Sequence, residues 1–216
     1  MSTTETAAQI INPDMPDVPS HAPSKIHLKD YRPPSFDVET VDLDIKLFDD
    51  HAIVDSTLVM QRQTDGDLVL YGEALELMSI KLNDEPLARN RYTQAEGTLT
   101  ITDAPENTRL QLQVRIHPHT NTALEGLYIA GSGDDTMFVS QCEPEGFRKI
   151  TFYPDRPDVL AIFTTRLEAD KRFPTLLSNG NLLMVKNDDT HVFNRRSFYS
   201  FMAYIIRYTF TIHHFG

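Results

Sequence analysis

Hydrophobic and polar residues alternate along much of this chain, with a period of two residues. In residues 41–47 every second side chain is apolar, and the residues between them are Asp or Lys. Residues 110–116 repeat the pattern, with Gln and Arg at the polar positions. A period of two places alternate side chains on opposite faces of an extended chain. Both segments are therefore predicted to be strands with one buried face.

Further short apolar segments indicate more strands, and no segment offers three turns of amphipathic helix. These additional strands are expected near residues 54–60, 68–71, 75–82, 99–101, 137–139 and 160–169. The sequence Asn-Asp-Glu-Pro at 83–86 is typical of a turn between strands. Many short strands at a spacing of about 8–12 residues predict an all-β fold, an antiparallel β-sandwich or a pair of saddle-like sheets.

Composition divides the chain into three parts. Residues 1–24 are rich in Thr, Ala, Pro and Asp without periodicity, which predicts a disordered arm. Residues 25–181 carry the strand pattern and form the predicted domain. Residues 182–216 are atypical: 191–216 contain no acidic residue and many aromatic ones. The most apolar part, 200–212, is too short for a membrane span and contains Arg207.

The overall charge and the cysteine count narrow the possible partners and compartments. A net charge of −11 argues against a nucleic-acid backbone as the main partner. The single cysteine cannot form an internal disulfide and suits a reducing compartment. The first residues have neither a basic flank nor an apolar run, so no signal peptide is predicted. We therefore expect a cytoplasmic protein without membrane or nucleic-acid partners.

Residues 141–145, Gln-Cys-Glu-Pro-Glu, concentrate polar chemistry in one short stretch. In an extended chain Gln141, Glu143 and Glu145 would share one face. Gly146 then permits a turn, and the prolines at 154 and 157 prevent a helix from continuing. The stretch could hold a cation on a stiff acidic edge, or it could be a polar turn between two strands. Spacing alone favours the turn.

Motifs for metal binding or nucleophilic catalysis are not evident. The close histidine pairs, His117 with His119 and His213 with His214, lack both the i, i+4 spacing and a third ligand. Gly131-Ser132-Gly133 is not a serine-hydrolase elbow. Cys142 has no evident histidine partner, so we interpret it as a packed residue. Spacing alone therefore predicts a β-rich domain without a catalytic constellation.

Four longer motifs occur in a characteristic order. They are Asn-Thr-Ala-Leu-Glu-Gly-Leu-Tyr at 121–128, Gln-Cys-Glu-Pro-Glu-Gly-Phe-Arg at 141–148, Tyr-Pro-Asp-Arg-Pro-Asp-Val-Leu at 153–160 and Leu-Leu-Ser-Asn-Gly-Asn at 176–181. Over residues 25–181 the sequence resembles the N-terminal domain of the bacterial aminopeptidase N family, alanyl aminopeptidases among the zinc aminopeptidases. The resemblance implies a β-rich, saddle-like domain that packs on a separate zinc-bearing catalytic domain.

The resemblance also implies substrate-binding residues. In that family the Gln and Glu of the Gln-x-Glu element bind the free α-ammonium of a peptide substrate, and these positions are Gln141 and Glu143 here. An exopeptidase must recognise a chain end, whose distinguishing mark is a positive amine. A carboxylate ~4 Å from that amine contributes about 4 kcal/mol at an effective dielectric constant near 20. A neighbouring amide oxygen accepts a further hydrogen bond.

The sequence departs from the family pattern in two respects. The chain has no His-Glu-x-x-His helix and no Gly-x-Met-Glu-Asn element, so zinc is expected in the full-length family enzyme and not in this chain. The resemblance stops just after residue 181, which suggests a truncated or frame-shifted product. We therefore expect the chain to be inactive alone, with the peptide N-terminus and the missing catalytic domain as partners.

Two alternatives remain open. The chain could be a non-catalytic β-sandwich module that binds a protein or peptide through the same acidic edge. The tail could also prevent autonomous folding, because the loss of closing strands exposes a sheet edge and an apolar face.

Overall fold

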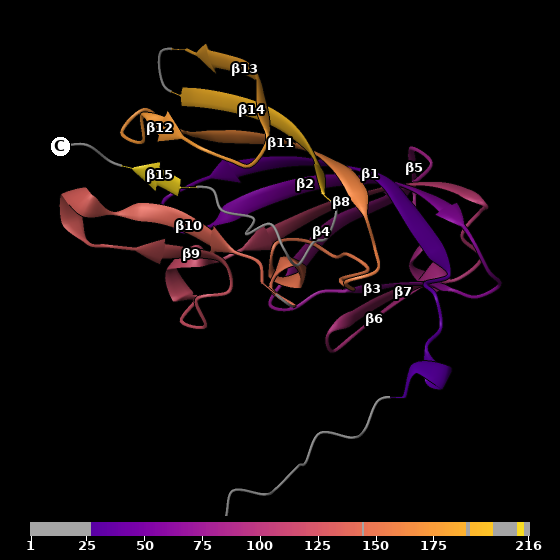
Figure 1. Ribbon diagram of the computed structural model, residues 1–216. Helices are drawn as coiled ribbons and strands as arrows, with labels where there is room; N and C mark the ends of the chain where they lie inside the picture. Colours follow the sequence, from indigo (N-terminus) through magenta and orange to yellow (C-terminus); the bar gives the residue numbers. More distant parts are fainter. Residues whose placement is uncertain (1–26, 144, 189–190, 201–210, 214–216) are drawn as a thin grey trace, which may run out of the picture. The chain divides into compact units, whose positions relative to one another are not determined.

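The computed structural model describes residues 27–143, 145–188, 191–200 and 211–213 (Figure 1). The chain divides into two compact units, Met1–Arg32 and Pro33–Gly216. In the described part of the first unit, a single 3-10 turn, η1, spans Leu28–Asp30. The arm expected at 1–24 lies outside the described residues. The fold described below belongs to the second unit.

The largest sheet of the second unit contains eight strands among the described residues, in the order β13-β14-β11-β1-β2-β8-β4-β5. Their bounds are β13 Asn181–Asn187, β14 His191–Ser200, β11 Ala161–Asp170, β1 Phe36–Leu47, β2 Ala52–Arg62, β8 Asn107–Ile116, β4 Glu76–Leu82 and β5 Glu85–Pro86. In the part of the chain that is described no α-helix occurs, and the predicted all-β fold is confirmed.

Two smaller sheets complete the described fold. One has the order β12-β15-β10-β9 and the other the order β3-β7-β6. Their bounds are β12 Thr175–Leu176, β15 Thr211–His213, β10 Met137–Gln141, β9 Gly126–Ala130, β3 Leu68–Tyr71, β7 Thr98–Ile101 and β6 Tyr92–Ala95. Short 3-10 turns lie between the strands: η2 Arg89–Arg91, η3 Pro118–Thr120, η4 Gly133–Asp135 and η5 Phe147–Lys149.

The predicted alternation of residues 41–47 and 110–116 is confirmed. Apolar residues of β1 and β8 are buried, and the polar residues between them are half-buried or exposed. The polar residues form ion pairs across strands, for example Arg166 with Asp44 at 2.6 Å and Lys46 with Asp55 at 3.2 Å. One face of these central strands therefore packs on the core, and the opposite face carries paired charges.

One strand pairing differs from the antiparallel order expected from the sequence. β1 and β11 run parallel, with Thr40 opposite Ile162 and Lys46 opposite Glu168. Every other strand pair in the described residues is antiparallel. Parallel neighbours need a long crossover connection, and the connection here comprises all the strands between β1 and β11. Alternation within each strand carries no information about that distant pairing.

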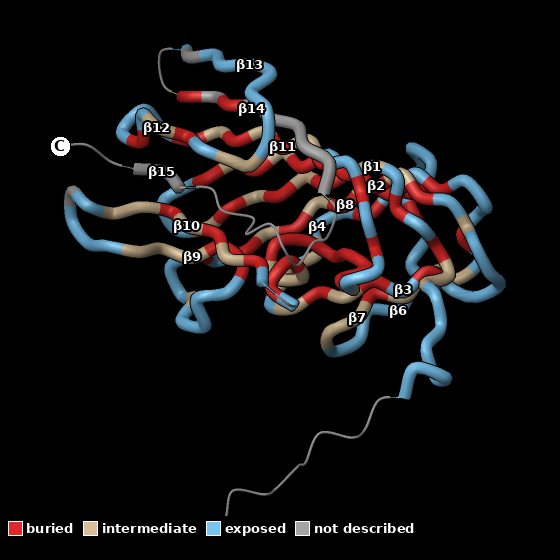
Figure 2. Tube along the Cα trace, viewed as in Figure 1, coloured by how far each residue is buried: buried red, intermediate tan, exposed pale blue. Residues whose placement is uncertain are grey.

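The buried residues lie along the central strands and in the segment that follows β10 (Figure 2). Leu58 of β2, Leu70 of β3 and Leu99 of β7 have no exposed surface. The segment after β10 adds Phe147 and Tyr153, whose rings contact each other edge to face at 5.0 Å. An irregular segment that buries aromatic rings in the core has little freedom to move.

The region after residue 181 continues the large sheet. β14 pairs with β11 along its whole length, from Ala161 opposite Ser200 to Asp170 opposite His191. β13 pairs with β14 on the outer side, and β15 pairs with both β10 and β12. Residues 201–210 and 214–216 of the atypical tail lie outside the described residues. The boundary expected after residue 181 stays a prediction.

Candidate functional site

The polar stretch lies where β10 ends. Gln141 is the last residue of β10, is half-buried and pairs with Gly126 of β9. Cys142 is buried, and burial raises the pKa of its thiol. Glu143 is exposed. The two predicted binding residues therefore flank one packed side chain, as alternation in an extended segment requires.

The chain turns immediately after Glu143. The amide of Gly146 donates a 2.7 Å hydrogen bond to the carbonyl of Glu143. Gly146 is buried, and a Cβ atom there would lie 2.9 Å from the carbonyl oxygen of Gln141. Glu145 has a positive φ of 77°. The strand pattern therefore ends before Glu145, which lies on the turn and does not continue the face of Gln141 and Glu143.

Arg148 fixes the turn to the rest of the domain. Its Nε donates to Asp155 Oδ2 at 3.0 Å, its amide donates to the same oxygen at 3.2 Å, and its Nη2 donates to the carbonyl of Asp155 at 3.2 Å. Its Nη1 lies 3.3 Å from Glu145 Oε2 and 3.9 Å from Glu73 Oε1. Its guanidinium also stacks on the ring of Tyr71, 4.8 Å from the centroid. One side chain thus joins β3, the loop after β3 and the turn.

Two opposite effects act on the buried pair of Arg148 and Asp155. Burial raises the pKa of the Asp155 carboxyl, although hydrogen bonds from Arg148 oppose that change. Burial lowers the pKa of Arg148, but the hydrogen bond and charge of Asp155, together with the charges of Glu145 and Glu73, raise it by more. Arg148 donates two hydrogen bonds to the Asp155 carboxylate, from its amide and from Nε, and a third from Nη2 to the carbonyl of Asp155. The two hydrogen bonds to the carboxylate favour its charged form.

The neighbouring Lys149 connects the same turn to two other segments. Its Nζ lies 2.7 Å from Glu125 Oε2 and 3.6 Å from Glu73 Oε2. The hydrogen bond with Glu125 raises the pKa of Lys149. Gly126, the residue opposite Gln141, has a φ of 70° and approaches Lys149 so closely that a Cβ atom would lie 2.6 Å from the lysine Cβ. The backbone beside Gln141 is therefore tightly packed.

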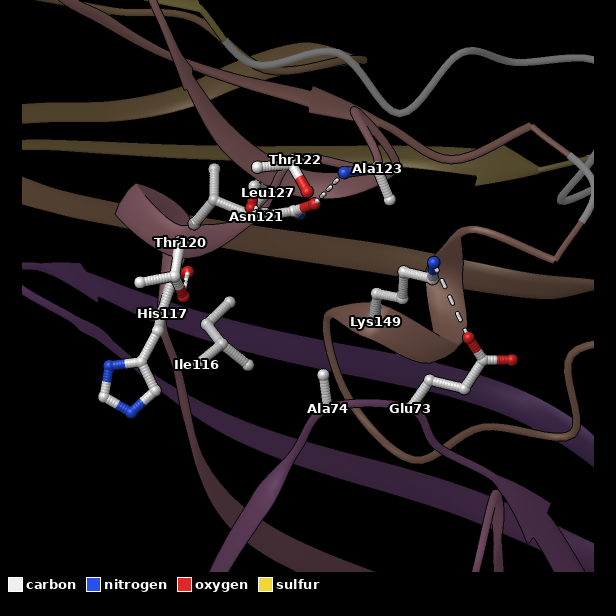
Figure 3. Close-up of a pocket in the computed structure, with 10 residues that line it drawn as sticks. All are labelled: Glu73, Ala74, Ile116, His117, Thr120, Asn121, Thr122, Ala123, Leu127 and Lys149. Atoms are coloured by element: carbon white, nitrogen blue, oxygen red, sulfur yellow. Dashed lines mark hydrogen bonds and ion pairs between the residues drawn. The ribbon is translucent and has the colours of Figure 1, made fainter.

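A cavity of about 400 Å³ lies beside this turn but does not contain Gln141 or Glu143 (Figure 3). Its polar side chains already contact the protein. Lys149 pairs with two carboxylates, and His117 Nε2 is 3.0 Å from Glu76 Oε1. The side-chain amide of Asn121 donates to the carbonyls of Glu125 and Leu127 and its oxygen accepts from the amide of Ala123. This cavity therefore offers few polar groups to a ligand.

The histidine pairs do not come together as a metal site. His117 is hydrogen-bonded to Glu76, and the ring of His119 meets Phe138 edge to face at 6.2 Å. The side chain of His213 and the whole of His214 are outside the described part. Within the described residues, no three His, Cys, Asp or Glu side chains are grouped so that they could hold a metal ion. None of the described helices is long and apolar enough to cross a membrane.

Sequence reasoning missed the residues that hold the turn in place. Arg148 and Asp155 lie within the stretch that the sequence pointed to, but nothing in their spacing predicts that they form a buried pair. Glu73 comes from a loop more distant in the chain, and no local pattern connects it with residues 141–149. An acidic residue in a polar loop is common, so its partner becomes evident only in the folded chain.

Comparisons with known proteins agree with the resemblance noted from the motifs. The Peptidase M1 N-terminal domain family matches residues 33–201. Over 162 residues the chain is 46% identical to aminopeptidase N of Caulobacter vibrioides and 44% identical to aminopeptidase N of Escherichia coli. Each match covers 74% of this chain and 18% of the relative. The chain therefore spans less than a fifth of the length of these curated relatives.

Solved structures show the same fold. The crystal structure of Legionella pneumophila aminopeptidase A in complex with aspartic acid is 28% identical, with a TM-score of 0.71 over 86% of this chain and 22% of that chain. An M1 zinc metallopeptidase from Deinococcus radiodurans, bound to a Tyr-Ser-Ala substrate, is 18% identical, with a TM-score of 0.66 over 83% of this chain and 42% of that chain. The predicted family is confirmed by the sequence matches, and the chain belongs to the Peptidase M1 N-terminal domain family.

Proposed function

We propose that this chain forms the amine-binding wall of a zinc-dependent aminopeptidase that removes residues from the N-terminus of peptides. Gln141 and Glu143 anchor the free α-ammonium of the substrate. The observation that carries the proposal is their placement on either side of buried Cys142, with Glu143 exposed at the end of β10. An exposed carboxylate next to an amide group matches the charge and the hydrogen-bond donors of an ammonium ion.

The packing around the turn supports this role. Gly146 folds back on residues 141–143, and Arg148 ties the turn to buried Asp155. A binding residue on a backbone that is already ordered loses little conformational entropy when the ligand arrives. The two anchors are therefore presented in nearly the geometry in which they bind.

The hydrolytic chemistry belongs to another part of the proposed enzyme. Among the described residues no three His, Cys, Asp or Glu side chains are grouped so that they could hold a metal ion, and the proposal therefore assigns the zinc ion to the remainder of the enzyme. The relatives that match here are more than five times longer than the matched region, and their remaining residues are the proposed partner. The chain contributes substrate orientation, and no bond-breaking step is assigned to its residues.

The proposed setting is peptide catabolism in the cytoplasm. The only cysteine, Cys142, is buried, so the fold depends on no internal disulfide and is compatible with a reducing compartment.

The experiment uses a chimera in which residues 33–201 replace the matching region of Caulobacter vibrioides aminopeptidase N. We expect Glu143→Gln to lower kcat/KM for an alanyl anilide by about 10- to 100-fold, mainly through KM, because a hydrogen bond to a charged group contributes about 1.5–3 kcal/mol. Glu85→Gln, which changes an exposed carboxylate on β5, is the matched control and should leave kcat/KM unchanged. The chain alone with added zinc should release no alanine.

An unchanged KM and kcat for Glu143→Gln in an active chimera would remove Glu143 from the site. Zinc-dependent turnover by the chain alone would contradict the division of roles between this domain and the rest of the enzyme.

A further inference from the structure

The loop that opens the motif at 121–128 lies beside the proposed binding residues and contains neither of them. It starts from the short turn η3, in which Pro118 is buried and its carbonyl accepts a 3.3 Å hydrogen bond from the amide of Asn121. Residues 122–125 are exposed, and the chain re-enters a sheet at Gly126, the first residue of β9. The loop therefore connects a point that is fixed to the core with the strand that pairs with β10.

The side chain of Asn121 closes this loop. Its Nδ2 donates to the carbonyl of Glu125 at 2.6 Å and to the carbonyl of Leu127 at 2.9 Å. Its Oδ1 accepts from the amide of Ala123 at 3.2 Å, the dashed line beside Asn121 in Figure 3. The two carbonyls belong to the residues on either side of Gly126. Both donors and the acceptor of one carboxamide thus fix the backbone around that glycine.

The backbone of the loop is strained at Leu124. This residue has a φ of 57°, a conformation that is uncommon for a residue other than glycine. The leucine side chain is 57% exposed, so its own burial does not explain the conformation. Strained residues persist where the surrounding structure determines them. The hydrogen bonds of Asn121 to the residues before and after Leu124 supply that constraint.

Gln141 depends on Gly126 for its place at the end of β10. Gly126 is its partner in β9, whereas β15 pairs, within the described residues, with Met137 to Val139 and does not reach Gln141. A displacement of Gly126 would therefore move Gln141. The backbone of Glu143 has a different support, because its carbonyl accepts a hydrogen bond within the turn that follows.

We propose that Asn121 is a positioning residue for the aminopeptidase reaction, acting on the substrate amine through Gly126 and Gln141. The inference rests on the proposed function, since it takes Gln141 as the amide anchor, and it assigns no contact between Asn121 and the substrate. A charge-assisted hydrogen bond to an ammonium group spans about 2.7–2.9 Å. A small displacement of Gln141 is therefore enough to weaken substrate binding.

The test uses the chimera described above. Asn121→Ala removes three hydrogen bonds and should raise KM for an alanyl anilide by about 3- to 10-fold, with little change in kcat. Gln141→Ala, which removes the anchor itself, should raise KM by about 10-fold or more. Circular dichroism verifies that each variant is folded.

Asn83→Ala is the matched control. Asn83 also binds backbone groups through its side chain: its Oδ1 accepts from the amide of Arg109 at 2.7 Å and its Nδ2 donates to the carbonyl of Asn107 at 3.4 Å. It lies at the turn between β4 and β5. Its loss should lower stability, as the loss of Asn121 does, but should leave KM unchanged.

A double-mutant cycle separates positioning from a general loosening of the domain. In a Gln141→Ala background, Asn121→Ala should raise KM no further, because the group that Asn121 positions is already absent. In a Glu143→Gln background, Asn121→Ala should keep its full effect on KM. An equal effect of Asn121→Ala in both backgrounds would overturn the inference.

An NMR measurement on the full chain alone needs no catalytic activity. Asn121→Ala should shift the backbone amide resonances of Gly126 and Gln141, whereas Asn83→Ala should leave both in place. Unmoved resonances in folded Asn121→Ala would overturn the inference.

The kinetic results also distinguish this inference from the proposed function. If Gln141→Ala raises KM and Asn121→Ala does not, Asn121 has no positioning role and the proposed function stands. If Gln141→Ala leaves KM and kcat unaltered, both proposals fail for the amide anchor.

Discussion

At the scale of single residues, Arg148 holds in place the turn that follows the proposed binding residues. Arg148 contacts Asp155, Glu145 and Glu73, and it stacks on Tyr71. Because Asp155 is almost completely buried, its carboxylate depends on Arg148 for compensation. A buried charge pair contributes little net stability, but the loss of one partner leaves the other unpaired in the interior.

Arg148→Met is therefore expected to lower the free energy of unfolding by about 3–5 kcal/mol, because it leaves Asp155 buried without its partner. Chemical denaturation followed by circular dichroism measures the change. Arg109→Met is the matched control: Arg109 also pairs with an aspartate, Asp84, but at the exposed surface, and its loss should reduce stability by less than about 1 kcal/mol. Equal losses for the two variants would show that Asp155 does not depend on Arg148.

His117 provides a residue-scale prediction that depends on pH. The hydrogen bond with Glu76 is the largest cause that raises the pKa of His117. The hydrogen bond with the carbonyl of Asp50 and the charge of Glu76 also raise it, and the net shift is upward although burial and the Arg115 charge lower it. A raised pKa means that the folded state favours protonated His117, so the stabilisation is complete below its ordinary pKa of about 6.5. It is lost as the pH rises through the higher pKa of the folded state.

Glu76→Gln should therefore lower the pKa of His117 in an NMR titration. It should also reduce stability more at acidic pH than above the folded-state pKa. Glu73→Gln, which changes another carboxylate beside the same cavity, should leave the titration of His117 unaltered. An identical titration curve for wild type and Glu76→Gln would contradict the assigned cause.

At the scale of elements, the site depends on two backbone segments that meet closely. Gly126 begins β9 with a φ of 70°, and its Cα faces Lys149 of η5. Only glycine accepts both the left-handed conformation and this approach without strain. The segment that carries Glu125 and the turn that carries Lys149 are thereby held together, next to Gln141.

Gly126→Ala is expected to destabilise the domain by about 1–3 kcal/mol through backbone strain alone. The new Cβ must also displace Lys149, which adds a further loss of stability. Gly97→Ala is the matched control, since Gly97 has a similar φ of 74° and a Cβ added there would have no atom within 4 Å. Thermal denaturation should show the larger loss for Gly126→Ala. If both variants lose the same stability, the contact with Lys149 does not constrain the site.

Elements also show what periodicity can and cannot predict. The strands around residues 41–47 and 110–116 follow from alternation, because one face of each packs on the core and the other is charged. The parallel neighbour of β1 does not follow, since β11 lies more than a hundred residues later. Sequence alternation predicts a strand but not its partner.

At the scale of the whole molecule, the chain matches one part of much longer relatives. The chain has the fold of the Peptidase M1 N-terminal domain over residues 33–201 and 18% of the length of its curated relatives. The proposed anchors need a catalytic partner that supplies zinc and the remaining chemistry.

Local pattern was sufficient for the β-rich fold, for the main strands and, through four ordered motifs, for the family. Those properties depend on neighbouring residues, whose spacing is visible in the chain. The pairing of Arg148 with Asp155 and Glu73, the parallel contact of β1 with β11, and the exposure of the apolar residues 182–185 emerged only in three dimensions. Each depends on which distant segments exclude water from one another, and that outcome belongs to the packing of the complete fold.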